Sequence, residues 1–265
     1  MGAGLFSNPL LSDPWFYAAA IPAVIAVGMA KGGISGLGIL GVPILALAIS
    51  PVQAAAIILP ILIVQDVVSI WVFRGLWSLR LVAILMIGGM AGVALGYGLA
   101  ASVSTPAVEL SLGAICIAFG TQRIWQEWKG GEPRTSPAPD WIGVIFGVVA
   151  GFTSQIAHAG GPPVQIFLMQ RRVERDLFLG TSTLFFAILN WVKVPAYLAL
   201  GQFTPDNLGA ALVLFPLAVI STLAGARLAR SLTGRTFFRV TYVLMVLLGL
   251  KLAWDGAHAL WLARG

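Results

Sequence analysis

Long apolar segments separated by short polar loops run along nearly the whole chain. We identify ten of them, at residues 15–29, 34–49, 52–73, 79–102, 106–125, 141–157, 162–170, 177–200, 207–229 and 237–261. Several reach the ~20 residues that a membrane-spanning helix needs. Their apolar residues do not alternate with polar ones, as the strands of a transmembrane β-barrel would. The pattern therefore predicts an all-α polytopic membrane protein.

The segments fall into two similar halves. A polar stretch rich in proline and glycine, "QEWKGGEPRTSPAPD" at 126–140, divides an N-terminal repeat, 1–125, from a C-terminal repeat, 141–265. Each half starts with two short segments that meet at a glycine-rich break, and three longer segments follow. A gapless superposition of 31–44 on 151–164 aligns one Gly-x-Pro motif with the other. Weak internal symmetry of this kind is typical of transporter repeats.

Basic residues predict how the chain is oriented. Most Lys and Arg residues lie in the linker or in alternate loops, and the intervening turns have none. The positive-inside rule then places the 126–140 linker in the cytoplasm and both termini outside, in the inner (plasma) membrane of a bacterium. Five elements per half reverse the direction of the second half, so we predict repeats of inverted topology. Each repeat would be a broken or re-entrant helix pair plus three transmembrane helices.

The glycine-rich breaks are the feature that most needs explanation. We expect the first two segments of each half to be too short to span a core of ~30 Å, so that each pair forms a hairpin with its tip inside the bilayer. The tips are "KGGISGLG" at 31–38 and "SQIAHAGG" at 154–161. Irregular backbone at that depth must be buried in protein or line a cavity. Inverted symmetry would bring the two tips together near the midplane.

Composition narrows the classes of function. The chain is 58% hydrophobic and only 10% charged, far from a soluble domain. Its net charge of +6 resides in loops between spans, so we expect no nucleic-acid partner. Cys116 is the single cysteine, so no intramolecular disulfide can form. No metal-ligand cluster, phosphate loop or dinucleotide fingerprint appears, and we predict neither a cofactor nor a metal site.

The residues at the two tips suit an oxyanion. Helix N-termini and glycines let an anion approach free backbone N–H groups. Lys31 would add a full positive charge. The other candidate substrate ligands at the tips are Gly33, Ser35, Gly36, Ser154, Gln155, His158 and Gly160. The alternative is that the glycines only allow close helix packing and that Lys31 extends to an interface.

Four further polar residues fall inside long segments. Gln65 and Asp66 lie in the third segment of the first half, and Asn190 and Lys193 lie in the matching segment of the second half. Asn190 and Lys193 share one helix face and could add to the substrate site. Asp66, with Gln65 beside it, could be a counter-ion to either lysine or a coupling residue. The alternatives are an Asp66 pair with Arg74 and a Lys193 that extends outward.

The glycine-rich motifs resemble those of a known family. "GISGLGILGVPIL" at 33–45 and "AHAGGPPVQIFLM" at 157–169, each followed by three further segments, resemble the sulfite exporter TauE/SafE family, also called the toluene sulfonate uptake permease family. The resemblance covers about residues 16–255. It implies transport of sulfite or an organosulfonate across a bacterial inner membrane, often as export. Many members carry a denser glycine tract where this chain has "GISGLG".

We therefore predict a secondary transporter, an exporter of a small sulfur-containing oxyanion bound between the two tips, and not an enzyme. An anion channel with two re-entrant loops is the alternative. A less favoured one is an intramembrane serine protease, because "GISG" at 33–36 fits a G-x-S-G pattern and His158 could be the base for Ser35. The expected partners are a small anion, the lipid bilayer and a second copy of the chain in a homodimer.

Overall fold

The computed structural model describes residues 8–34, 36–100, 104–129, 139–171, 173–231 and 235–262. Within these ranges every regular element is a helix. The first half contains α1 (Pro9–Ser12), α2 (Pro14–Lys31), the 3₁₀ helix η1 (Leu37–Leu40), α3 (Gly41–Leu45), α4 (Pro51–Val72), α5 (Leu79–Ala100) and α6 (Thr105–Lys129). The second contains α7 (Asp140–Ala157), α8 (Gly161–Gln170), α9 (Arg175–Ala199), α10 (Pro205–Ser231) and α11 (Arg235–Leu262).

Six helices in the described ranges are long and apolar enough to cross a membrane: α2, α4, α5, α7, α9 and α10. The prediction of a helical polytopic membrane protein is thus confirmed. The expected length of the first helix in each half was wrong, because α2 and α7 each have 18 residues. At ~1.5 Å per residue they extend about 27 Å, most of the apolar core. Only the second members, η1 with α3 and α8, are short.

Local sequence explains where these helices begin and end. The Asp13 side chain caps α2 by accepting a hydrogen bond from the N–H of Trp15, and a proline occupies the first turn. The helix ends where Gly33 and Gly36 adopt φ angles of 113° and 102°, which favour glycine. In α7 the same role falls to His158, with φ 52°. Both breaks are therefore sharp changes of direction, as the glycine-rich sequence indicated.

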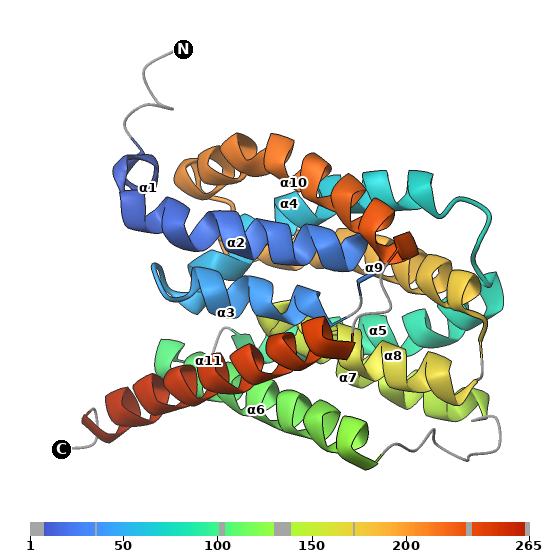
Figure 1. Cartoon of the computed structure of the whole chain (residues 1–265). Coiled ribbons are helices and arrows are strands. Elements are labelled where there is room, and N and C mark those ends of the chain that lie inside the picture. The colour runs from blue at the N-terminus through green and yellow to red at the C-terminus, as the bar shows by residue number, and fades with distance from the viewer. Residues whose placement is uncertain are drawn as a thin grey trace.

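Small residues bring helices from the two halves into close contact. A Cβ on Gly32 of α2 would lie 2.4 Å from the backbone nitrogen of Ala226 in α10. Likewise, a Cβ on Gly92 of α5 would lie 2.1 Å from the carbonyl oxygen of Val148 in α7. α2 thus packs mainly against α10, and α7 against α5. α4 contacts α9, and α6 lies beside α11 as a separate pair (Figure 1). Close contact through small residues is the usual packing of membrane helices.

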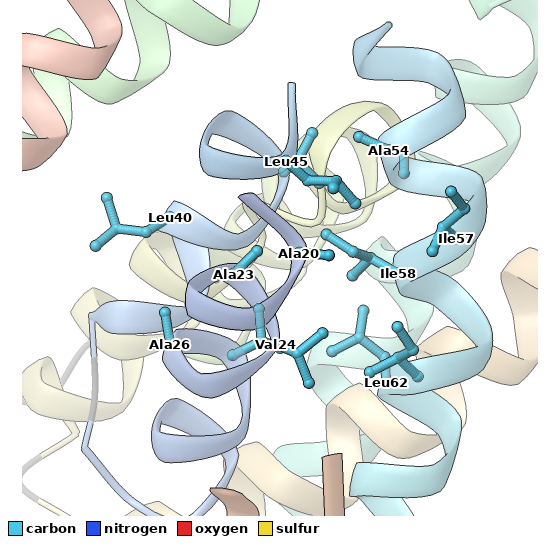
Figure 2. Close-up of a cluster of buried hydrophobic side chains, with 14 of the residues drawn as sticks. Ala20, Ala23, Val24, Ala26, Leu40, Leu45, Ala54, Ile57, Ile58 and Leu62 are labelled. Carbon is cyan, nitrogen blue, oxygen red and sulfur yellow. The ribbon is translucent and has the colours of Figure 1, made fainter. Parts of the chain in front are cut away.

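The largest buried apolar cluster joins the first hairpin to α4. Figure 2 shows side chains of α2, η1, α3 and α4 meeting in it, with Val24 of α2 and Ile58 and Leu62 of α4 among them. These side chains fix the depth at which α2 ends. The breaks after α2 and α7 are therefore held inside the bundle.

The chain termini lie at one end of the helix bundle, and the helices that flank the linker meet at the other (Figure 1). α1 and the C-terminal end of α11 lie at one end, and the end of α6 and the start of α7 lie at the other (Figure 1). Asn8 donates a hydrogen bond of 2.7 Å to the carbonyl of Asp206 at the first end, which we name the terminus end. Asp140 bonds Arg80 at 2.8 Å and Arg171 at 2.7 Å at the other, the linker end.

Candidate functional site

A cavity of about 110 Å³ lies between the two helix breaks. Side chains and backbone from α2, η1, α4, α7, α8 and α9 line it. It includes five residues that the sequence singled out: Lys31, Gly36, Ser154, His158 and Asn190. The two tips thus face one partly open space, which we call the first cavity. Its volume is enough for a small ion or a few water molecules.

An ion pair stands at one side of the first cavity. Lys31, the last residue of α2, donates a hydrogen bond to one carboxylate oxygen of Asp66. The other oxygen accepts a bond of 2.6 Å from the side-chain amide of Asn190. Lys31 Nζ also lies 5.3 Å from the ring centroid of Phe186, and Ser69 Oγ donates a 3.0 Å bond to the Lys31 carbonyl. The side chain of Lys31 is 12% exposed and that of Asp66 3%, so the pair is largely dehydrated.

A second lysine does not line the cavity itself but contacts two residues that do, and none of its contacts is a carboxylate. Lys193 is fully buried, and Nζ contacts Ser154 Oγ at 3.1 Å, the Ser154 carbonyl at 3.3 Å and His158 Nδ1 at 2.7 Å. None of the ion pairs in the described part of the chain includes it. The site therefore holds two amines and one carboxylate, an excess of basic groups.

His158 is engaged at both ring nitrogens. Nε2 lies 2.9 Å from the carbonyl oxygen of Ala55, which can only accept, so Nε2 carries the hydrogen. Nδ1 then accepts from Lys193. In this arrangement the imidazole is neutral and has no free N–H for an anion. His158 positions Lys193 and joins the end of α7 to α4.

The second hairpin offers fewer backbone donors than expected. α8 begins with Gly161, Pro162 and Pro163, and the prolines have no N–H. Two of the first N–H groups of this helix are therefore missing. Side chains must supply most of the donors to an anion on that side.

Six of the described candidate residues do not line the first cavity; two of them, Asp66 and Lys193, contact residues that do. A Cβ on Gly160 would lie 2.6 Å from the Ala150 carbonyl, so this glycine serves close packing. Gly33 lies in the turn that ends α2, where its N–H donates to the carbonyl of Ala30. The Gln65 amide contacts the carbonyl of Val24 at 3.4 Å, and Gln155 lines a different cavity. Ser35 lies outside the described residues.

The sequence analysis missed Ser182, Thr183 and Phe186, which also line the first cavity. They share a stripe of α9 with Asn190 and Lys193, at the three- and four-residue spacing of one helix face. The hydroxyl of Ser182 is buried without a hydrogen-bond partner. The sequence could have indicated these residues, because Ser182 and Thr183 are polar positions that precede Asn190 on the same face of the helix.

The arrangement suits binding an anion better than cleaving a bond. The ring nitrogens of His158 contact a carbonyl and an amine, not a serine hydroxyl, so nothing described here activates a nucleophile. One amine, an amide and hydroxyls line a cavity inside the bundle, and a second amine, Lys193, contacts the lining residues Ser154 and His158.

Comparison with known proteins agrees with this geometry. No curated protein and no solved structure matched the chain. The model of one protein family, described as "Sulfite exporter TauE/SafE", matches residues 20–252 and so includes both helix breaks and all the cavity residues described above. The chain belongs to the sulfite exporter TauE/SafE family.

Proposed function

We propose that this membrane transporter is a secondary carrier that exports a small sulfur-containing oxyanion, sulfite or a short organosulfonate, and binds it in the first cavity. Membership of the family implies transport of the exporter type. The observation that supports the site is the excess of basic groups in and beside this cavity in the bundle. Lys31 and Lys193 are opposed there by Asp66 alone among the described ion pairs.

The energetic argument favours an anionic ligand. A charged side chain within a membrane-spanning segment costs up to about 2.5–3.5 kcal/mol, the insertion-scale value at the centre of a helix. Asp66 offsets this cost for Lys31, but the bonds of Lys193 go to uncharged groups. A bound oxyanion supplies the missing negative charge, so it gains more from the lysines than a neutral ligand, which could only accept their hydrogen bonds.

The side chains present can coordinate such an anion. Lys31 and Asn190 both donate to Asp66 in this structure, and both line the cavity. An oxyanion would compete with the carboxylate for these two donors. Ser182, whose buried hydroxyl has no partner, would donate to a further oxygen. A sulfonate group has three oxygen atoms that point in different directions. These oxygens can accept hydrogen bonds from Lys31, Asn190 and Ser182, which lie on different parts of the cavity wall.

Two features support the inverted repeats. α2, the first helix of one half, packs on α10 of the other half, and α7, the first helix of the second half, packs on α5 of the first. Each half thus makes the same kind of contact with the other. The two halves also share a hydrogen bond of the same kind. In the first half Ser69, three residues after Asp66, donates to the carbonyl of Lys31 on α2. In the second half Lys193, three residues after Asn190, donates to the carbonyl of Ser154 on α7. We infer that the halves rock about the contact between α4 and α9, which would expose the site to each side in turn.

A panel of oxyanions tests the proposal. In a thermal-shift assay on the purified protein, sulfite and methanesulfonate should raise the melting temperature by an amount that grows with the logarithm of their concentration above Kd, and chloride should not. In proteoliposomes, saturable counterflow of the same anion would establish a carrier. Ohmic current without counterflow would instead favour the anion channel. Lys31→Met should abolish the shift, and Lys251→Met, in an exposed ion pair of α11, is the matched control.

A further inference from the structure

A second cavity of about 300 Å³ lies nearer the terminus end of the bundle. Its lining comes from α4, α5, α6, α7 and α9 and from the turn after α9. The lining residues include Ala55, Leu99, Gln155, Tyr197 and Gln202. Those from α4, α5 and α9 lie near the helix ends that carry Ser50, Ala100 and Leu200. The first cavity instead includes Phe178 and Leu179, near the linker end of α9.

A single layer of residues divides the two cavities. Ser154 lines the first and Gln155, its neighbour in α7, lines the second. His158 lines the first, and its bond of 2.9 Å reaches the carbonyl of Ala55, which lines the second. The Tyr197 hydroxyl closes the layer with a bond of 3.1 Å to the Gln155 carbonyl.

Lys193 is the buried amine within this layer. Its contacts, Ser154 and His158, line the first cavity, and Tyr197, four residues along the same helix, lines the second. Because no described carboxylate pairs with it, an anion on either side of the layer gains from its charge. Electrostatics therefore favours passage beside Lys193 rather than elsewhere in the bundle.

Gln155 supplies a polar group that the fold itself does not use. The residue is 4% exposed, and its buried side-chain oxygen has no hydrogen-bond partner. A buried polar atom without a partner costs free energy. Because no partner fixes that oxygen, the amide can rotate and present its NH₂ group to a ligand in the second cavity.

We propose that the second cavity is a second binding site for the transported oxyanion, which passes between the two cavities beside Lys193 and is held by the Gln155 amide on the terminus side. The inference rests on the proposed function. It adds a site on the path where the anion meets uncharged donors, weaker than the lysines, from which it leaves toward the terminus end.

The first test separates binding from transport. Gln155→Leu removes the amide at similar volume, and Gln53→Leu, on neither cavity, is its control. Loss of a bond to an anion predicts about a tenfold fall in methanesulfonate counterflow. The Kd for the purified protein should change less than about twofold, because the first cavity is intact. Wild-type counterflow in a folded Gln155→Leu protein would overturn the second site.

The second test needs no loss of function. In a Cys116→Ser background, Gln202→Cys should react with a membrane-impermeant thiol reagent from the terminus side and Thr183→Cys from the linker side. Methanesulfonate, which does not consume the reagent, should protect both. Reaction of Gln202→Cys from the linker side, or without protection, would refute the second site. If neither sulfite nor methanesulfonate binds the wild-type protein, the proposed function fails first, and the second site with it.

Discussion

Asn190 donates a hydrogen bond of 2.6 Å to Asp66, from a position 124 residues further along the chain. The bond joins α4 to α9, the corresponding long helices that follow the breaks in the two halves. The other oxygen of the same carboxylate holds Lys31 at the end of α2. Asp66 is thus the point at which three helices and both halves of the chain are connected.

Removing the Asp66 carboxylate should destabilise the protein strongly. Asp66→Ala leaves Lys31 without its counter-charge, and breaking a buried ion pair costs about 3–5 kcal/mol. The free energy of unfolding in mild detergent measures the loss. Lys31→Met combined with Asp66→Leu removes both charges and should recover most of the stability without restoring anion binding. A single variant as stable as the wild type would contradict the structural role of the pair.

An oxyanion should rescue the same single variant. Without Asp66, the anion no longer competes with a carboxylate for Lys31 and Asn190, so it binds more tightly. The thermal shift that a fixed concentration of methanesulfonate produces should therefore be larger in Asp66→Ala than in the wild type. An equal or smaller shift would mean that the anion does not share donors with Asp66.

His158 should tolerate asparagine better than alanine. Its φ of 52° is left-handed, a conformation that asparagine adopts readily and that costs alanine about 1–2 kcal/mol. His158→Ala also removes the partners of Lys193 and of the Ala55 carbonyl. We expect the melting temperature to fall further for His158→Ala than for His158→Asn. Equal losses would show that backbone conformation contributes nothing here.

The sequence predicted the features that depend on local chemistry. Hydropathy identified the long spans, and glycine-rich runs marked the breaks near Gly33 and His158. Asp66 was a candidate counter-ion to either lysine, and in the structure it pairs with Lys31. Periodicity and turn chemistry are read from neighbouring residues, which is why these predictions needed no structure.

The sequence could not predict the hydrogen-bond or ion-pair partner of each buried polar group. Lys31 was compatible with an anion, an interface or Asp66, and only the packing of α2 against α4 selects the carboxylate. His158 was expected to donate to the ligand, but the register of α7 against α4 and α9 directs its nitrogens to Ala55 and Lys193. Such choices depend on contacts between residues distant in the chain, which one sequence does not contain.

Two glycines of α5 should respond oppositely to alanine. A Cβ on Gly92 would lie 2.1 Å from the Val148 carbonyl, so Gly92→Ala must separate α5 from α7. A Cβ on Gly98 meets nothing within 4 Å. Gly98→Ala should be neutral or stabilise by up to about 1 kcal/mol through helix propensity, whereas Gly92→Ala should destabilise by about 1–3 kcal/mol through overpacking. Unfolding in detergent compares them, and similar losses in both would exclude close packing as the cause.

The orientation of the bundle remains a prediction from its basic residues. Arg80 and Arg171 both bond Asp140 at the linker end, which should therefore face the cytoplasm. A green fluorescent protein inserted between positions 131 and 132 should fluoresce, since it matures in the cytoplasm. Alkaline phosphatase fused to the C-terminus should be active, because it folds only outside. The exchanged fusions, with each reporter at the other position, are the matched controls and should both be silent. The reverse pattern would place the termini inside. The linker end, and with it the first cavity, would then face the exterior.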